Sequence, residues 1–257
     1  MPAPIHARPP GQNHLLAQVP QGEYKQFLPY LEHVRLVHKE ILTRPGDQIS
    51  HVYFPTRGAI SLITHVNHTR GVETATTGRD GCVGVSVVFE DTTCLQDWLV
   101  QVPGEAQRMT IIDFQRALQT SQSLRYLVGR YTIALLNQTA RGSACNRRHP
   151  IEQRLARWLL VVHDLADGDE LPLTQEFLAL MLGVRRASVN QTAGVLQNAM
   201  LIDYRPGLIT VLDRDRLERA SCEDYRRSRE EYERLLGQPS TQHADRTPPD
   251  RDPPSQR

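Results

Sequence analysis

The sequence has 257 residues, well above the ~150 that one domain usually takes, so we expect one large domain or two modest ones. Its hydrophobic fraction of 39% and charged fraction of 23% exclude collagen-like, fully disordered and membrane-spanning chains. A net charge of +1 argues against a protein whose whole surface coats nucleic acid, and it leaves a local basic patch open.

The two ends of the chain, residues 1–12 and 237–257, are rich in Pro and have no apolar period, so we expect both to be disordered. There is neither an apolar run of the ~20 residues that a bilayer span needs nor a secretory signal, which indicates a cytoplasmic protein without membrane contact. The four cysteines lie too far apart in sequence for a zinc or iron–sulfur cluster, so we expect reduced thiols and no metal. They are Cys82, Cys94, Cys145 and Cys222.

Between about residues 34 and 102, short apolar runs alternate with glycine-containing turns. The runs lie at residues 34–37, 51–54 and 58–63. Glycines recur at intervals of roughly 8–12 residues or less, which is the rhythm of a small antiparallel barrel or sandwich. We predict an all-β core that ends near Val102-Pro103-Gly104.

From residue 123 to about residue 145 the pattern is helical. Six positions follow alternating spacings of four and three, the seam of a helix that needs a partner. They are Leu124, Val128, Tyr131, Leu135, Gln138 and Gly142. The seam packs either on the chain's own domain or on a second copy of the chain. Periodicity alone does not distinguish these two arrangements. We predict the second, a parallel homodimer.

Pro150 breaks this helix and is well placed to open the next, which should end near residues 166–169. Thr174 then caps a helix over residues 175–182, Gly183 permits a tight turn, and a second helix starts near Arg185. Ala179 is small where two helices would cross. Val184, Val189 and Leu196 would fill the core beneath the pair. The cap, the small residue, the turn glycine and the buried residues all occur at the spacing that a helix-turn-helix requires, so they predict this motif.

If those apolar positions point inward, the outer face at the start of the second helix holds Arg185, Arg186, Ala187, Asn190 and Gln191. This end enters the major groove in such motifs, where Arg pairs with guanine and Asn or Gln with adenine. We also expect Thr174, Gln175 and Ser188 to contact DNA. The alternative is an ordinary pair of helices with a solvated polar face.

A short strand pair follows at residues 201–204 and 208–212, joined by a turn at Arg205-Pro206-Gly207. This is the ending of a winged helix-turn-helix, and Arg205 on the wing is a candidate phosphate contact. We expect a single charged helix over residues 217–236, anchored by Tyr225, Tyr232 and Leu235.

Over about residues 14–215 this order of elements resembles the Crp/Fnr family of bacterial transcription regulators. The resemblance is carried by Arg44-Pro45-Gly46-Asp47, by Val52-Tyr53-Phe54 with Gly58, by residues 151–157 and by the helix-turn-helix. It implies an α+β fold: a β-roll or jelly-roll sensor domain over residues 13–145, whose dimerisation helix spans about 123–145, and a winged helix-turn-helix domain over 146–236. It also implies a homodimer on a palindromic DNA operator, with RNA polymerase as a further candidate partner.

The resemblance is incomplete at both candidate sites. In the DNA-reading helix an Arg of the family matches Arg186, while Ala187 stands where the family has Glu and Gln191 where it has a later Arg. We therefore expect this helix to prefer different bases from those that the family's reading helix prefers. In the cyclic-nucleotide members a phosphate cassette begins with Gly-Glu and ends with Arg-Ser. Here Cys82 replaces the ribose-binding carboxylate, and the phosphate-pairing Arg is missing.

Truncating a buried charge pair of that kind costs ~2–5 kcal/mol, so we expect no cyclic AMP in the family's usual mode. The barrel then takes a different effector or none. The candidate effector-pocket residues are Arg79, Gly81, Cys82, Val83, Gly84, Cys94 and Leu95. We also expect no iron–sulfur cluster, because no cysteine precedes Cys82, and we predict no cofactor.

The sequence also bears on two other classes of protein, enzymes and interaction modules. Residues 84–88 begin like a nucleophile elbow but lack its closing glycine, and residues 78–84 lack the Lys of a phosphate-binding loop, so we expect no enzyme. A regulatory interaction module that does not read DNA is the alternative. Salt-dependent, sequence-specific DNA binding would separate it from a transcription regulator.

Overall fold

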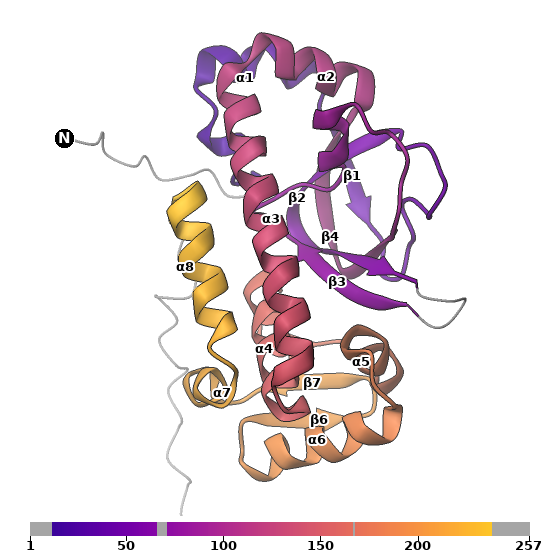
Figure 1. Ribbon diagram of the computed structural model, residues 1–257, viewed down its shortest axis with the longest axis vertical. Helices are drawn as coiled ribbons and strands as arrows, with labels where there is room; N and C mark the ends of the chain where they lie inside the picture. Colours follow the sequence, from indigo (N-terminus) through magenta and orange to yellow (C-terminus); the bar gives the residue numbers. More distant parts are fainter. Residues whose placement is uncertain (1–11, 66–70, 167, 238–257) are drawn as a thin grey trace, which may run out of the picture.

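The computed structural model describes residues 12–65, 71–166 and 168–237. Its N-terminal unit is built on four antiparallel strands, in the order β1-β4-β2-β3 across the sheet (Figure 1). They are β1 (Glu32–Leu36), β2 (His51–Thr64), β3 (Val72–Thr77) and β4 (Asp97–Thr110). The expectation of an antiparallel β domain is therefore confirmed.

The two longest strands, β2 and β4, bend where glycines bring their backbones together. Gly58 has a φ of +79°, and a Cβ there would lie 2.5 Å from the carbonyl oxygen of Val102. A Cβ on Gly104 would lie 2.3 Å from the carbonyl oxygen of Arg57. The register shifts beside Arg57, as in a β-bulge. The prediction that the β core ends near Gly104 was therefore wrong, because the glycine lets the strand bend and continue to Thr110.

Helices close one end of this sheet. They are α1 (Gln21–Phe27), α2 (Ile111–Thr120) and the long α3 (Gln122–Arg148), with short 3₁₀ turns η1 (Leu16–Gln18), η2 (Leu28–Tyr30) and η3 (Val85–Phe89). Thr110 and Ser121 cap α2 and α3, since their side chains accept hydrogen bonds from the backbone N–H of Asp113 and Leu124. The predicted long helix is present, and it extends three residues beyond residue 145.

Four of the six positions of the predicted α3 seam lie inside the chain's own core. Leu124, Val128 and Tyr131 are fully buried, and Leu135 is 9% exposed, in the hydrophobic cluster that fills the β domain. Helix α3 contacts β3 and η3 on this side. These residues are therefore not available to a second copy, and the choice of this seam as the dimer interface was wrong. The apolar periodicity of α3 indicated a buried face, and that face packs against other parts of the same chain.

The C-terminal unit contains α4 (Ile151–Leu165), α5 (Gln175–Leu182) and α6 (Arg186–Asn198). Strands β5 (Glu170–Leu171), β6 (Ile202–Arg205) and β7 (Leu208–Val211) form a small sheet in the order β5-β7-β6. Pro150 is the N-cap of α4, and the turn between β6 and β7 has Gly207 at a φ of +82°. The predicted helix-turn-helix and wing are thus both present.

The closing segment is two helices, where the sequence predicted one. Helix α7 (Arg214–Ala220) ends where the backbone N–H of Ser221 bonds back to the carbonyl oxygens of Leu217 and Glu218. Helix α8 (Asp224–Leu236) then runs alongside α3 (Figure 1). The charged composition of this segment gave no sign of a break between two helices. Cys222, which lies between them, is buried only through tertiary packing.

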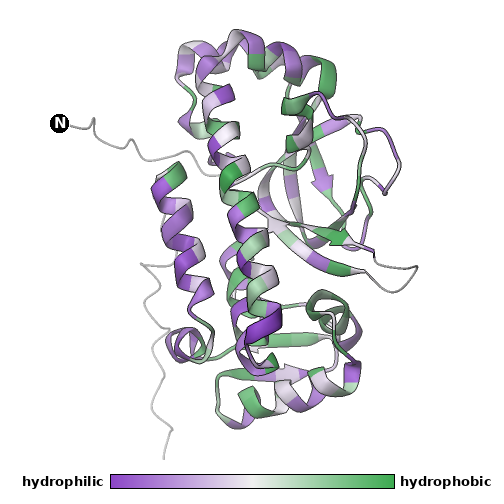
Figure 2. Ribbon diagram, in the orientation of Figure 1, coloured by the Kyte–Doolittle hydropathy of each residue, from purple (hydrophilic) through white to green (hydrophobic). Residues whose placement is uncertain are grey.

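Helix α8 links the two cores of the molecule. It is mostly hydrophilic (Figure 2), and its anchors are the ones predicted. Tyr225 lies in the core of the C-terminal unit, while Tyr232 and Leu235 pack against the core of the β domain. Of the helices in the described ranges, none has the length and apolar character that a bilayer crossing requires.

Candidate functional site

Helices α5 and α6 form a tight pair, and α5 is capped at both ends. The Thr174 hydroxyl oxygen accepts from the N–H of Phe177 at 3.2 Å, and Gly183 adopts the left-handed conformation that ends α5. Ala179 and Val189 are buried between the helices, as the sequence predicted. Arg185 is the N-cap of α6, so that helix begins at Arg186.

One side of α6 is open to solvent. The residues exposed there are Arg185, Arg186, Ala187, Asn190 and Gln191, which are the five that the sequence placed on the outer face. Thr174 is exposed as well, while Ser188 and Gln175 are partly buried. The first turn of α6 carries no acidic residue, so its helix dipole and two arginines present only positive charge.

Gln175, from the preceding helix, organises this face. Its Oε1 accepts from Nε of Arg186 at 2.8 Å, and its Nε2 donates to Oδ1 of Asn190 at 3.1 Å. Arg186 and Asn190 are one helical turn apart and are thus held in a fixed relation before any ligand arrives. The wing residue Arg205 lies 2.9 Å from Asp203 with a side chain that is 74% exposed.

The residues proposed for an effector pocket do not share one environment. Cys82, Val83 and Cys94 are buried in the β core, whereas Leu95 is 74% exposed. Burial raises the pKa of the Cys82 thiol. Arg79 reaches toward α4, where its Nη2 donates to the backbone oxygen of Asp164 at 3.4 Å.

Tyr131 fills the space beside this segment. A Cβ on Gly81 would lie 2.3 Å from the Tyr131 ring, so the ring stacks directly on the glycine backbone. The hydroxyl groups of Tyr131 and Thr77 are hydrogen-bonded at 2.8 Å. A nucleotide at this place would first have to displace a fully buried tyrosine.

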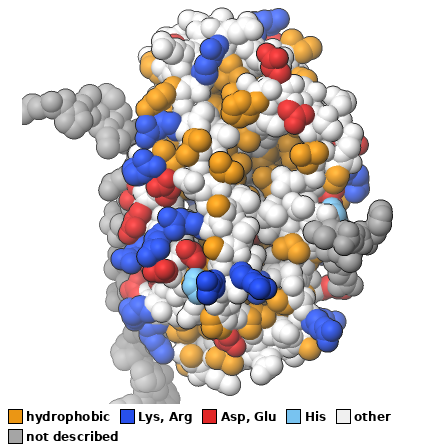
Figure 3. Space-filling view, viewed as in Figure 1, with side chains coloured by type: hydrophobic (Ala, Val, Ile, Leu, Met, Phe, Trp, Pro, Cys, Tyr) orange, Lys and Arg blue, Asp and Glu red, His pale blue; other side chains and the backbone are white. Residues whose placement is uncertain are grey.

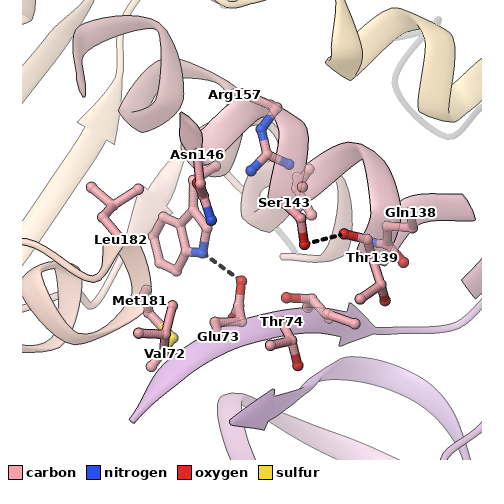
Figure 4. Close-up of a pocket in the computed structure, with 15 residues that line it drawn as sticks. Val72, Glu73, Thr74, Gln138, Thr139, Ser143, Asn146, Arg157, Met181 and Leu182 are labelled. Carbon is pink, nitrogen blue, oxygen red and sulfur yellow. Dashed lines mark hydrogen bonds between the residues drawn. The ribbon is translucent and has the colours of Figure 1, made fainter. Parts of the chain in front are cut away.

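A cavity of about 200 Å³ lies between β3, α3, α4 and α5, where the two units meet (Figure 4). Glu73 projects from β3 and is held by two donors: Nε1 of Trp158 at 2.8 Å and the Ser61 hydroxyl at 2.7 Å. Burial raises the pKa of the Glu73 carboxyl, and these hydrogen bonds oppose that effect.

Two polar atoms of residues that line this cavity have no hydrogen-bond partner among the described residues. They are Oε1 of Gln138 and Nε of Arg157, and both are shielded from solvent. Gln138 and Gly142, which the sequence placed in the dimer seam, line the cavity as well. The sequence did not indicate that Glu73, Arg157 and Trp158 meet, because their meeting depends on the docking of the two units.

Cys145 and Cys222 are brought together by the return of α8 along α3, with their Sγ atoms 3.3 Å apart. The spacing in sequence that argued against a zinc or iron–sulfur cluster therefore does not describe the distance in space for this pair. The hydrogen bond with the Cys222 thiol is the main cause that lowers the pKa of Cys145. With His149 and Asp224 they are the single group of convergent metal-ligand side chains within residues 12–65, 71–166 and 168–237.

Comparison with protein families identifies residues 153–220 as a Crp-like helix-turn-helix domain. This match contains α5, α6, the wing and all of α7, together with most of α4. No curated protein matches the sequence.

A similar fold, over about three quarters of this chain or more, is found in solved structures of low sequence identity. The c-di-GMP-responsive global regulator CLP of Xanthomonas campestris is 22% identical, with a TM-score of 0.60 over 75% of this chain and 99% of that one. FixK2 of Bradyrhizobium japonicum is 14% identical, with a TM-score of 0.64 over 75% and 98%. A crp/fnr-family transcriptional regulator of Eubacterium rectale is 15% identical, with a TM-score of 0.63 over 81% and 99%. These likenesses establish the fold.

Proposed function

We propose that the chain is a DNA-binding transcription regulator of the Crp/Fnr type, and that it binds a palindromic operator as a homodimer through α6. The observation that carries this proposal is the exposed face of α6, where Gln175 holds Arg186 and Asn190. Arg reads guanine and Asn reads adenine in the major groove. Regulators of this family are not enzymes.

The homodimer would use a face of α3 other than the predicted seam. Tyr126, Gly129, Ile133, Leu136 and Ala140 recur at alternating spacings of three and four, and none of them is buried. Tyr126, Ile133 and Leu136 are 59%, 48% and 63% exposed. Figure 3 shows hydrophobic side chains gathered on the central part of this side of the molecule.

We define these five residues as the α3 stripe. Its spacing is that of a coiled-coil seam, which a second copy of the same helix fits. Because the opposite side of α3 is already covered by β3 and α8, the stripe is the side on which α3 can meet its symmetry mate.

The signal that the protein responds to is proposed to act at the cavity rather than at the cassette. The cavity borders β3 of the N-terminal unit and α4 and α5 of the C-terminal unit, so a bound molecule would contact both. Gln138 and Arg157 offer it an acceptor and a donor that are otherwise unpartnered. A small hydrogen-bonding effector of this kind would replace cyclic AMP. We place the protein in the cytoplasm, where its operator lies, with RNA polymerase as a candidate partner.

The test is selection of bound duplexes from a random DNA pool by the purified full chain. It is run with and without cyclic AMP, cyclic GMP and c-di-GMP, the last because CLP responds to it. The proposal expects one enriched palindrome whose binding weakens as salt rises. Failure to shift any DNA would favour a regulatory interaction module. Micromolar cyclic AMP binding that survives Cys94→Ala would contradict the prediction about the cassette.

A further inference from the structure

Four side chains that ligate metals converge where α3 ends and α8 begins. Cys145 lies on the last turn of α3, and His149 is the C-cap of that helix, where its backbone N–H donates to the carbonyl oxygen of Cys145 at 3.0 Å. Cys222 lies between α7 and α8, and Asp224 is the first residue of α8. The four ligand atoms all lie within 4.8 Å of one another.

The individual distances suit a single ion. The Sγ atoms of Cys145 and Cys222 are 3.3 Å apart, and Nδ1 of His149 lies 3.3 Å from Sγ of Cys145. The same Nδ1 lies 3.5 Å from Oδ2 of Asp224. Tetrahedral zinc with bonds of ~2.0–2.3 Å sets its ligands roughly 3.3–3.8 Å apart. The three pairs therefore need little or no movement to accept the ion.

The surroundings suit it as well. Both thiols are buried, and the side chains of His149 and Asp224 are 26% and 13% exposed. Nη1 of Arg141 lies 3.7 Å from the second oxygen of Asp224. Two thiolates and a carboxylate leave a zinc site with one excess negative charge, which the guanidinium offsets while it orients the carboxylate.

We propose that Cys145, His149, Cys222 and Asp224 bind one zinc ion, which fastens the start of α8 to the end of α3. A disulfide between the two cysteines is the competing use of this cluster. Zinc is favoured because an imidazole and a carboxylate point at the same position, which a disulfide does not require. In a reducing compartment, paired cysteines are also more often metal ligands than disulfides.

The ion would sit at a mechanically important place. His149 immediately precedes Pro150, the break between α3 and α4. A ligand bond to His149 would hold the last turn of α3 against α8 and thereby fix the angle at which the C-terminal unit leaves the long helix. The proposal does not depend on DNA binding, since zinc content is measured on the protein alone.

The test is zinc content of the full chain after reduction, zinc loading and desalting. Wild type should retain one zinc per chain, and Cys222→Ser and Asp224→Asn should retain at least tenfold less. Cys94→Ser is the matched control, since Cys94 is a buried free thiol outside the cluster, and it should keep its zinc. Circular dichroism checks that each variant is folded, and the partly exposed Asp224 is the milder change.

Cobalt provides a second readout, because four-coordinate cobalt bound to thiolates absorbs strongly in visible light. Cobalt-loaded wild type and Cys94→Ser should show this band, and Cys222→Ser should lack it. Zinc at a hundredfold excess over its Kd should raise the Tm of wild type by about 5 °C or more, and that of Cys222→Ser far less. Folded wild type that holds no zinc after loading, or a Cys145–Cys222 disulfide that forms in its place, would overturn the proposal.

Discussion

Gln175 shows how a side chain outside the reading helix shapes what that helix presents. It lies on α5, and its amide bonds Arg186 with one end and Asn190 with the other. A bound base edge would compete with Gln175 or be positioned by it. Either way, the two base-reading groups act as one connected unit.

Arg186→Ala should weaken binding to the selected operator about 5- to 150-fold, because one bidentate pair with guanine is worth ~1–3 kcal/mol. Fluorescence anisotropy on labelled duplexes measures this. Arg226→Ala on α8, where the side chain is 69% exposed, is the charge-matched control and should bind as wild type does. If both variants bind equally well, α6 has been wrongly chosen as the reading face.

Glu73 makes the stability of the protein depend on pH. Burial raises its pKa above the ordinary 4.5, so the folded state holds the proton to a higher pH than the unfolded chain does. Below about pH 4.5 both states are protonated and there is no net effect. As pH rises from there through the raised pKa, the folded state loses stability.

Glu73→Gln should therefore gain in Tm relative to wild type as the pH rises above 4.5, since it keeps the acceptor for Trp158 without a charge. Differential scanning fluorimetry across the pH range gives the comparison. Glu105→Gln, on an exposed position of β4, is the control and should track wild type. A Tm difference for Glu73→Gln that does not vary with pH would count against a buried, titrating carboxyl.

Helix α3 has different tasks on its different sides. One side packs into the β core, a second receives α8, and the third carries the α3 stripe. Apolar residues occur on more than one of these sides. Hydrophobic periodicity identifies such a helix and does not say which side meets a second chain.

Ile133→Asp combined with Leu136→Asp should convert the dimer to a monomer, since facing carboxylates in a symmetric interface repel. A loss of about 100-fold or more in dimer affinity is expected. Sedimentation velocity over a concentration series measures it. Val37→Asp, which changes a Val that is 60% exposed elsewhere, should leave the dimer intact. Dimers in the double variant would show that another surface joins the two copies.

The molecule as a whole joins its two units through buried contacts. Ala59, Ile63, Leu99 and Val102 of the β domain belong to the same hydrophobic cluster as α4, α5 and α6. The Trp158–Glu73 hydrogen bond crosses this boundary beside the cavity. A change in the N-terminal unit therefore has a direct mechanical route to the reading helix.

A symmetric dimer predicts the form of the operator. The selected site should be a palindrome whose half-sites lie ~10 base pairs apart, or a multiple of that, because two α6 helices must enter successive major grooves. The Ile133→Asp, Leu136→Asp variant should keep the half-site preference while losing affinity for the full site. Enrichment of a single asymmetric half-site by wild type would contradict the symmetric arrangement.

The sequence by itself determined the local architecture. The cap at Thr174, the turn at Gly183 and the buried Val189 specify the helix-turn-helix, and the outward face of α6 follows from them by geometry. Turn glycines and apolar runs likewise predicted the β domain. All of these signals act between residues close in sequence, where spacing alone fixes which side chains share a face.

Only the tertiary structure decided which surfaces of the helices are buried within the chain and which are open to a partner. The seam of α3 is core, the α3 stripe is open, and Cys145 meets Cys222 from 77 residues away. The cavity exists because β3 and α4 dock, although neither carries a signal of the other. Contacts of this kind depend on how whole elements pack, and burial can satisfy the same apolar pattern within one chain or between two.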